Sequence, residues 1–384
     1  MSASQWRKAM NSSATAAVAR GRAMPVSPMA AGAAGHQPGH ASGLDEAPVS
    51  SFHWPRPALR HLVVVFALVL FPFVATSFLT FQVGAQALVL GMIALSLSFL
   101  AGYGGMVSLA QMTVAGIAGY AMAVFGHSSS ADISLNWPWW LAVPIAILIA
   151  VLSSALIGWL SVRTEGIYTI MITLAIGVAF YYLVLQNYSV FNGFQGLREL
   201  KPPTVFGVNW RDPLPFYALS LVCALAAYAL VSHVVRTPFG IALQGIRDNP
   251  RRMGALGYSV VSHRVAAYAL SGLIAAVGGI LLAWYNALMT PGSVGTGWLI
   301  NILIIAVLGG VKHPLGAFLG SLIFVLLQTF AIDLIDRERF NLVIGGVFLA
   351  IVLFSPDGLL GLWAKLRLRF GSARPMTSNQ RRQP

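Results

Sequence analysis

Between two long apolar segments, residues 237–257 read TPFGIALQGIRDNPRRMGALG. This stretch is basic and soluble in character, and it reads as two short helices set at an angle, each opened by a cap residue and a proline. A glycine then stands where the second helix should end. The residues that mark these helix ends are Thr237, Pro238, Asn249, Pro250 and Gly257. We therefore expect a folded, basic helical hairpin within a chain that is otherwise apolar.

The composition of the chain is that of a membrane protein. Its 384 residues are 57% hydrophobic and only 9% charged, whereas about a quarter of the residues in a soluble domain are charged. The 24 Lys and Arg against 11 Asp and Glu lie in the tails and between apolar segments, which is unlike a nucleic-acid-binding face. This distribution follows the positive-inside rule and favours contact with anionic lipid. The single cysteine, Cys223, lies inside an apolar segment, and no histidine stands at metal-ligand spacing, so we expect no metal site.

From residue 61 onward the chain predicts a series of membrane spans, each near the roughly 20 residues that cross a bilayer. We place ten of them, of which the eighth is too short to cross alone and is expected to be broken or re-entrant. The predicted spans are 61–81, 84–101, 105–126, 138–161, 166–187, 214–235, 265–288, 298–311, 315–332 and 340–355.

The distribution of Lys and Arg predicts that both termini lie in the cytoplasm, because every second loop then carries the basic excess. Residues 1–52, rich in Ala, Gly, Ser, Met and Pro, are expected to form a disordered, low-complexity cytoplasmic extension. A transmembrane domain follows over 53–363, with a cytoplasmic loop at 236–264. Residues 364–384 are expected to form a basic cytoplasmic tail.

Several kinds of chemistry are missing from the sequence. The spans hold essentially no charged residue, although ion-coupled pumps generally need buried ionisable groups. No stretch fits the phosphate-binding P-loop, since Gly309-Gly310-Val311-Lys312 has the wrong spacing. Paired acids suited to general acid and base catalysis are absent as well. We therefore expect no enzymatic activity and a source of energy outside this chain, while a carrier that binds Na⁺ through backbone carbonyls stays open as an alternative.

One span end is rich in glycine. Gly102, Gly104 and Gly105 together predict an unusual backbone that is able to line a path. Polar residues at 108, 111 and 113 follow directly. Small residues four apart, such as Ala115 with Gly119 and those at 275 and 279, predict close packing between helices in lipid.

Four segments, in order, resemble the LivM-type permease subunits of branched-chain amino acid ABC importers, and the resemblance extends over about residues 61–363. They read LAGYGGMVSLAQ at 100–111, TPFGIALQGIRDNPRRMGALG at 237–257, AVLGG at 306–310 and SPDGLLG at 355–361. The chain departs from the family at Ala110-Gln111, where Gly-His is common, and at 191–197, where FNGFQGL replaces a TGGTDGL-like loop. Both departures lie in regions that the resemblance implies to meet the substrate or its carrier.

The resemblance implies an all-α, polytopic permease fold in the bacterial inner membrane. The chain would form half of a translocation pathway for branched-chain or related amino acids. Its implied partners are a second, LivH-type permease subunit, two cytoplasmic ATPase subunits that bind ATP and Mg²⁺, and a periplasmic substrate-binding protein. This chain itself would bind no cofactor. The alternative is an ion-coupled secondary transporter or a channel for a small polar solute.

Two sets of site residues follow from the residue pattern and the resemblance together. The hairpin is expected to be the ATPase-coupling loop, in which the side chains of 239, 243 and 246 form an apolar stripe that sits in a groove of the ATPase. Its residues are Phe239, Leu243, Ile246, Arg247, Asp248, Asn249 and Arg251. The expected pathway residues are Gly104, Gly105, Ser108, Gln111, Thr113 and Thr173.

Overall fold

The computed structural model describes residues 59–128, 133–164, 166–203, 207, 209–334, 345–346, 349, 358–359 and 361. Contacts divide the chain into Met1–Arg56 and Pro57–Pro384, and every described residue lies in the second unit. The expected extension 1–52, the tail 364–384 and nearly all of the predicted span 340–355 therefore lie outside the described residues.

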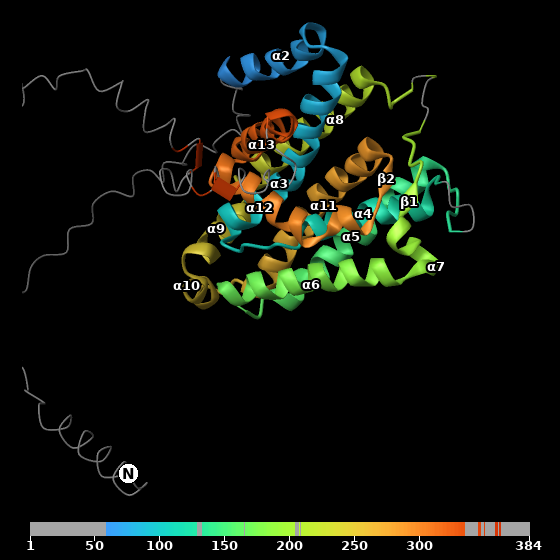
Figure 1. The fold of residues 1–384 in the computed structure, drawn as a ribbon. Coiled ribbons are helices and arrows are strands. Elements are labelled where there is room, and N and C mark those ends of the chain that lie inside the picture. Colours follow the sequence, from blue (N-terminus) through green and yellow to red (C-terminus); the bar gives the residue numbers. More distant parts are fainter. Residues whose placement is uncertain are drawn as a thin grey trace, which may run out of the picture. The chain divides into compact units, whose positions relative to one another are not determined.

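One helix occupies the centre of the second unit. The π-helical turn η2 (Leu79–Ala85) continues into α3 (Gln86–Gly104), and together they form a 26-residue apolar helix. Over an 18-residue apolar segment of this helix, 94% is buried inside the protein. A helix that is hydrophobic all round lies in a protein core or spans a membrane, and this one is enclosed by other helices. Its neighbours are α8 (Pro213–Val234), α11 (Val260–Asn286), α12 (Thr296–Gly309) and α13 (Pro314–Leu334) (Figure 1).

The long helix α11 also packs closely against α4 (Gln111–Phe125) and α5 (Trp139–Ser161). Small residues allow this approach, because a Cβ atom on Gly279 would overlap the backbone of Ala115 on α4. The predicted packing through small residues is therefore confirmed at this pair. The hydroxyl of Ser154 on α5 also donates a hydrogen bond of 2.7 Å to the carbonyl oxygen of Tyr268 on α11.

The predicted eighth span is part of a sharply bent pair of helices. Thr296–Gly309 and Pro314–Phe330 meet at 117°, which agrees with the expectation of a broken or re-entrant segment. A Cβ atom on Gly309 or on Gly316 would overlap the backbone of the other helix. The two glycines therefore allow α12 and α13 to pack closely at the bend.

The boundaries of several predicted spans differ from the structure, and α11 begins at Val260 rather than at residue 265. Helix α2 (Leu59–Val74) ends before the predicted limit of the first span, and Leu79 already belongs to the central helix. Helix α4 begins at Gln111 rather than at residue 105. By length and hydropathy, five helices of the described part are able to cross a membrane, or six if the bent pair forms one span. The all-α class is confirmed for the described residues, whereas the count of ten spans stays a prediction.

A group of short elements follows α6 (Ile167–Gln186). Strand β1 pairs antiparallel with β2, so that Leu197 lies opposite Met289 and Arg198 opposite Leu288. This pairing holds the chain after α6 against the end of α11. The elements are α7 (Tyr188–Phe191), η3 (Gly193–Gln195), β1 (Leu197–Arg198), β2 (Leu288–Met289) and η4 (Pro291–Val294).

The basic stretch quoted first forms two short helices, α9 (Pro238–Asp248) and α10 (Pro250–Ala255). Figure 1 shows this hairpin at one end of the helix bundle and the strand pair β1–β2 at the opposite end. If the bundle crosses a membrane, the two features therefore face opposite sides of it.

Candidate functional site

The helix ends of the hairpin are those that the sequence predicts. The hydroxyl of Thr237 accepts a hydrogen bond of 3.4 Å from the amide of Gly240, and the side-chain oxygen of Asn249 accepts one of 3.0 Å from the amide of Arg252. These caps satisfy amide groups that the first turn of a helix leaves unpaired. Pro238 and Pro250 stand at the first helical positions, and Gly257, with φ of +90°, follows the end of α10.

The apolar stripe of α9 faces the chain's own helices. Leu243 and Ile246 are fully buried, and helix α9 packs against α3 and α11. Phe239 is half-buried and stacks on the imidazole of His263, with ring centroids 5.7 Å apart. Leu243 and Ile246 therefore have no exposed surface with which to fill a groove on a partner. These residues seat the hairpin on the bundle instead.

The outer face of the hairpin carries a different set of residues. Ile241 is 62% and Leu256 67% exposed, and both arginines of α10, Arg251 and Arg252, are exposed as well. Apolar and basic groups together make this face suited to a protein partner. Ile241 lies outside the apolar stripe of residues 239, 243 and 246, and the coupling role of the hairpin stays a prediction.

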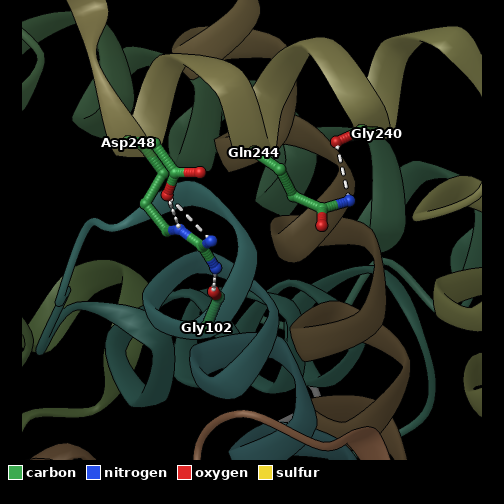
Figure 2. Close-up of polar contacts among 5 residues, drawn as sticks. Gly102, Gly240, Gln244 and Asp248 are labelled. Atoms are coloured by element: carbon green, nitrogen blue, oxygen red, sulfur yellow. Dashed lines mark hydrogen bonds and ion pairs between the residues drawn. The ribbon is translucent and has the colours of Figure 1, made fainter. Parts of the chain in front are cut away.

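Arg247 joins the hairpin to the glycine-rich end of α3. Its Nη1 atom donates a hydrogen bond of 2.6 Å to the carbonyl oxygen of Gly102, and its guanidinium also pairs with Asp248 at 2.9 Å (Figure 2). The carbonyls of the last turn of a helix lack intrahelical partners and carry partial negative charge, so a cation is favourable there. Two segments that are remote in sequence are thus in direct contact.

The glycines at this junction each have a structural role. Gly105 ends α3 in the left-handed region, with φ of +67°, where an L-residue with a side chain is strained. A Cβ atom at this position would lie 2.5 Å from Cγ of Arg247. A Cβ atom on Gly102 would overlap the carbonyl of Val311. The glycine cluster therefore terminates the central helix and admits close neighbours.

After Gly105 the chain turns back into the bundle without forming a helix. The side chain of Gln111, the first residue of α4, contacts Ser96, which lies eight residues before Gly104 and hence about 12 Å along the axis of α3. Helix α4 therefore begins inside the bundle, at membrane depth if the bundle crosses a bilayer. Irregular backbone at such a depth is tolerated where protein covers it or where it lines a cavity.

A buried polar network surrounds the start of α4. The side-chain oxygen of Gln111 accepts hydrogen bonds from the hydroxyls of Ser96 at 3.2 Å and Ser271 at 3.0 Å. The hydroxyl of Thr173, on α6, accepts one of 3.1 Å from the amide of Leu109. The network ties α3, α6 and α11 to the segment that leads into α4.

The predicted pathway residues thus lie around one break in the structure, and most of them are enclosed. Ser108, Gln111, Thr113 and Thr173 are at most 1% exposed, Gly104 is buried, and Gly105 is exposed. The side-chain nitrogen of Gln111 and the hydroxyl of Thr113 have no hydrogen-bond partner. A solute reaches these groups only if the helices around them move apart. Among the described residues no group of His, Cys, Asp or Glu is placed to hold a metal ion.

Residues 79–352 match the family described as the permease component of branched-chain amino acid transport systems. The chain is 24% identical to the high-affinity branched-chain amino acid permease LivM of Escherichia coli, over 77% of this chain and 73% of the relative. The ribose import permease RbsC of Haemophilus influenzae is 22% identical over 63% of this chain and 76% of its own length. A nucleoside ABC transporter permease of Lactococcus lactis, NupC, is 28% identical over 60% and 74%. No solved structure matches the chain.

Proposed function

Because the chain belongs to the family of permease components of branched-chain amino acid transport systems, we propose that it forms half of the translocation pathway for branched-chain or related amino acids. It is the membrane permease subunit of an ABC importer, and such subunits are not themselves enzymes. The observation that carries the proposed substrate class is the match to LivM, which covers 77% of this chain. The ribose and nucleoside permeases match shorter parts of it.

The proposed assembly contains a second permease subunit of the LivH type, two cytoplasmic ATPase subunits and a periplasmic substrate-binding protein, in the bacterial inner membrane. ATP and Mg²⁺ would be bound by the ATPase subunits. The absence of a P-loop and the near absence of charged residues from the predicted spans support this division of labour, because this sequence supplies neither a nucleotide site nor paired buried charges for ion coupling.

The proposed coupling element is the hairpin α9–α10. Its outer face, with Ile241, Leu256 and Arg251, would contact an ATPase subunit, and its inner stripe would transmit the movement to α3 and α11. Arg247 gives this route a direct contact, because it reaches the end of the central helix through the carbonyl of Gly102. A movement of the hairpin would then act on the segment 105–110 and on the start of α4.

The proposed pathway runs beside this segment. Gly104, Gly105, Ser108, Gln111, Thr113 and Thr173 would come into contact with the solute when ATP-driven movement opens the bundle. The unpaired nitrogen of Gln111 is a donor suited to a carboxylate oxygen, and the unpaired hydroxyl of Thr113 is able to donate or accept. Few and weak contacts suit a pathway, because a tight site would retain the solute.

Reconstitution of the whole importer tests the proposal. Vesicles that hold this chain, its second permease and the ATPase subunits should accumulate leucine, isoleucine and valine when the binding protein and ATP are supplied. Ribose, a nucleoside and urea form the comparison panel. Uptake of ribose or a nucleoside without uptake of the amino acids would overturn the proposed substrate class. The proposed role as an ABC permease subunit would still stand. Uptake by this chain alone, driven by an ion gradient, would favour a secondary transporter.

A further inference from the structure

An apolar crevice lies between three helices. It has a volume of about 400 Å³ and is lined by α5, α8, α11 and the loop that precedes α8. The side chains that carry the argument below are Trp139, Cys223, Val277 and Trp284 on the helices, with Pro202 and Trp210 in the loop. No charged side chain lines it.

The crevice begins at one end of the bundle and runs into its depth. On α5 its lining starts at Trp139, the first residue of the helix, and continues to Ile147, which is about 12 Å further along the axis. On α11 the lining includes Trp284, close to the end of that helix at Asn286. Tryptophan is the side chain that membrane proteins place at the boundary between headgroups and hydrocarbon. The crevice therefore leads from a membrane interface into the hydrocarbon region.

The mouth of the crevice carries basic groups. Lys201 adjoins Pro202, Arg211 adjoins Trp210, and both basic residues are exposed. Within the described residues neither forms an ion pair. Two acids lie in the same segment, of which Glu199 is exposed and Asp212 accepts a hydrogen bond of 3.3 Å from Asn209.

We propose that this crevice binds a glycerophospholipid with an anionic headgroup. One acyl chain would fill the apolar crevice, because water finds no hydrogen-bond partners there and hydrocarbon gains contact area with its walls. Lys201 and Arg211 would hold the phosphate at the mouth through charge-assisted hydrogen bonds. The inference does not depend on which solute the permease transports.

Native mass spectrometry of the full chain, purified from membranes in mild detergent, tests this assignment. The wild-type chain should retain a bound phospholipid, with phosphatidylglycerol preferred over phosphatidylethanolamine. Val277→Trp and Cys223→Phe, which fill the crevice from two different helices, should each lose it. Leu152→Trp is the matched control, because Leu152 is 59% exposed on α5 and lies outside the crevice, so this variant should keep the lipid. Retention of phospholipid by both filled variants would overturn the proposal.

Charge reversal tests the headgroup contact separately. Lys201→Glu and Arg211→Glu should each lower retention of phosphatidylglycerol by up to about fivefold. Retention of phosphatidylethanolamine should fall less, because its ammonium group offsets the charge of its phosphate. Arg198→Glu is the control, since this exposed residue of β1 does not adjoin a lining residue. An equal loss of both lipids in all three variants would overturn the role of the two basic residues.

The only cysteine of the chain, Cys223, reports what fills the crevice. Its alkylation by N-ethylmaleimide in the delipidated wild-type chain should slow by about fivefold or more when phosphatidylglycerol is returned. The opposite outcome is that lipid fails to protect Cys223 while the second permease subunit protects it. That result would overturn the lipid proposal and show that a transmembrane helix of that subunit fills the crevice. The same measurement on the Leu152→Trp control should match the wild type.

Discussion

Nη1 of Arg247 lies 2.6 Å from the carbonyl oxygen of Gly102, although the two residues are 145 positions apart in sequence. One belongs to the basic hairpin and the other to the last turn of the central helix. This hydrogen bond is a direct connection between the element proposed to receive energy and the segment proposed to border the pathway. A charge-assisted hydrogen bond is stronger than a neutral one, although partial exposure of Arg247 weakens it.

Arg247→Ala should uncouple the hairpin from the central helix. We expect the ATPase subunits still to bind, since Arg247 points to α3, while ATP-driven uptake falls roughly tenfold because the hairpin moves without α3. Uptake and ATPase binding are measured on the same vesicles. Asp248→Asn is the control, because it removes only the ion pair with an exposed carboxylate, and such pairs contribute little. Unchanged uptake in Arg247→Ala would exclude this connection.

Gly105→Ala should destabilise the chain by about 1–2 kcal/mol, because an alanine side chain is strained at positive φ. It should also displace Arg247, whose Cγ lies in the space of the added methyl group. Gly254→Ala is the matched control, since a Cβ atom there meets nothing within 4 Å and alanine favours a helix. Thermal unfolding in detergent distinguishes the two. A stable Gly105→Ala chain with normal uptake would contradict the role of this helix end.

Two neighbouring residues of α9 should respond in opposite ways to alanine substitution. Ile241→Ala should leave thermal stability within about 0.5 kcal/mol but weaken binding of the ATPase subunit by about tenfold, because Ile241 is exposed on the outer face. Leu243→Ala should cost about 2–5 kcal/mol of stability, since this side chain is fully buried. A pull-down of the ATPase subunit and a melting curve for each variant provide the measurement. Normal ATPase binding by Ile241→Ala would place the contact elsewhere.

Gln111→Leu tests the proposed pathway. Hydrogen bonds between membrane helices contribute about 0.6 kcal/mol each on average, and the hydroxyls of Ser96 and Ser271 keep bonds to carbonyl oxygens. The variant should therefore fold and assemble, while uptake falls severely because the donor to the solute is lost. Ser220→Ala is the control, as this buried hydroxyl on α8 also lacks a partner. Uptake equal to that of the control would remove Gln111 from the pathway.

Much of the fold is encoded locally and was therefore predictable. The caps at Thr237 and Asn249 depend on residues within a few positions, and the sequence signals for both helix starts are correct. Hydropathy located the membrane-length helices because each spans a continuous apolar run. Errors arose at the ends of helices, as at Gln111, where the glycines that stop α3 and the extended chain behind them look apolar in sequence.

By itself, the sequence determined that this is a helical membrane protein with one basic hairpin, because span length, capping and charge bias are properties of neighbouring residues. Only the tertiary structure decided which face of α9 points inward, because Leu243 is buried by helices that are distant in sequence. The tertiary structure also decided that Gln111 is enclosed, where it accepts a hydrogen bond from Ser271, 160 positions away. The bond between Arg247 and Gly102 belongs to the same class. Such contacts depend on which helices pack together, and the spacing of residues along one helix does not specify that.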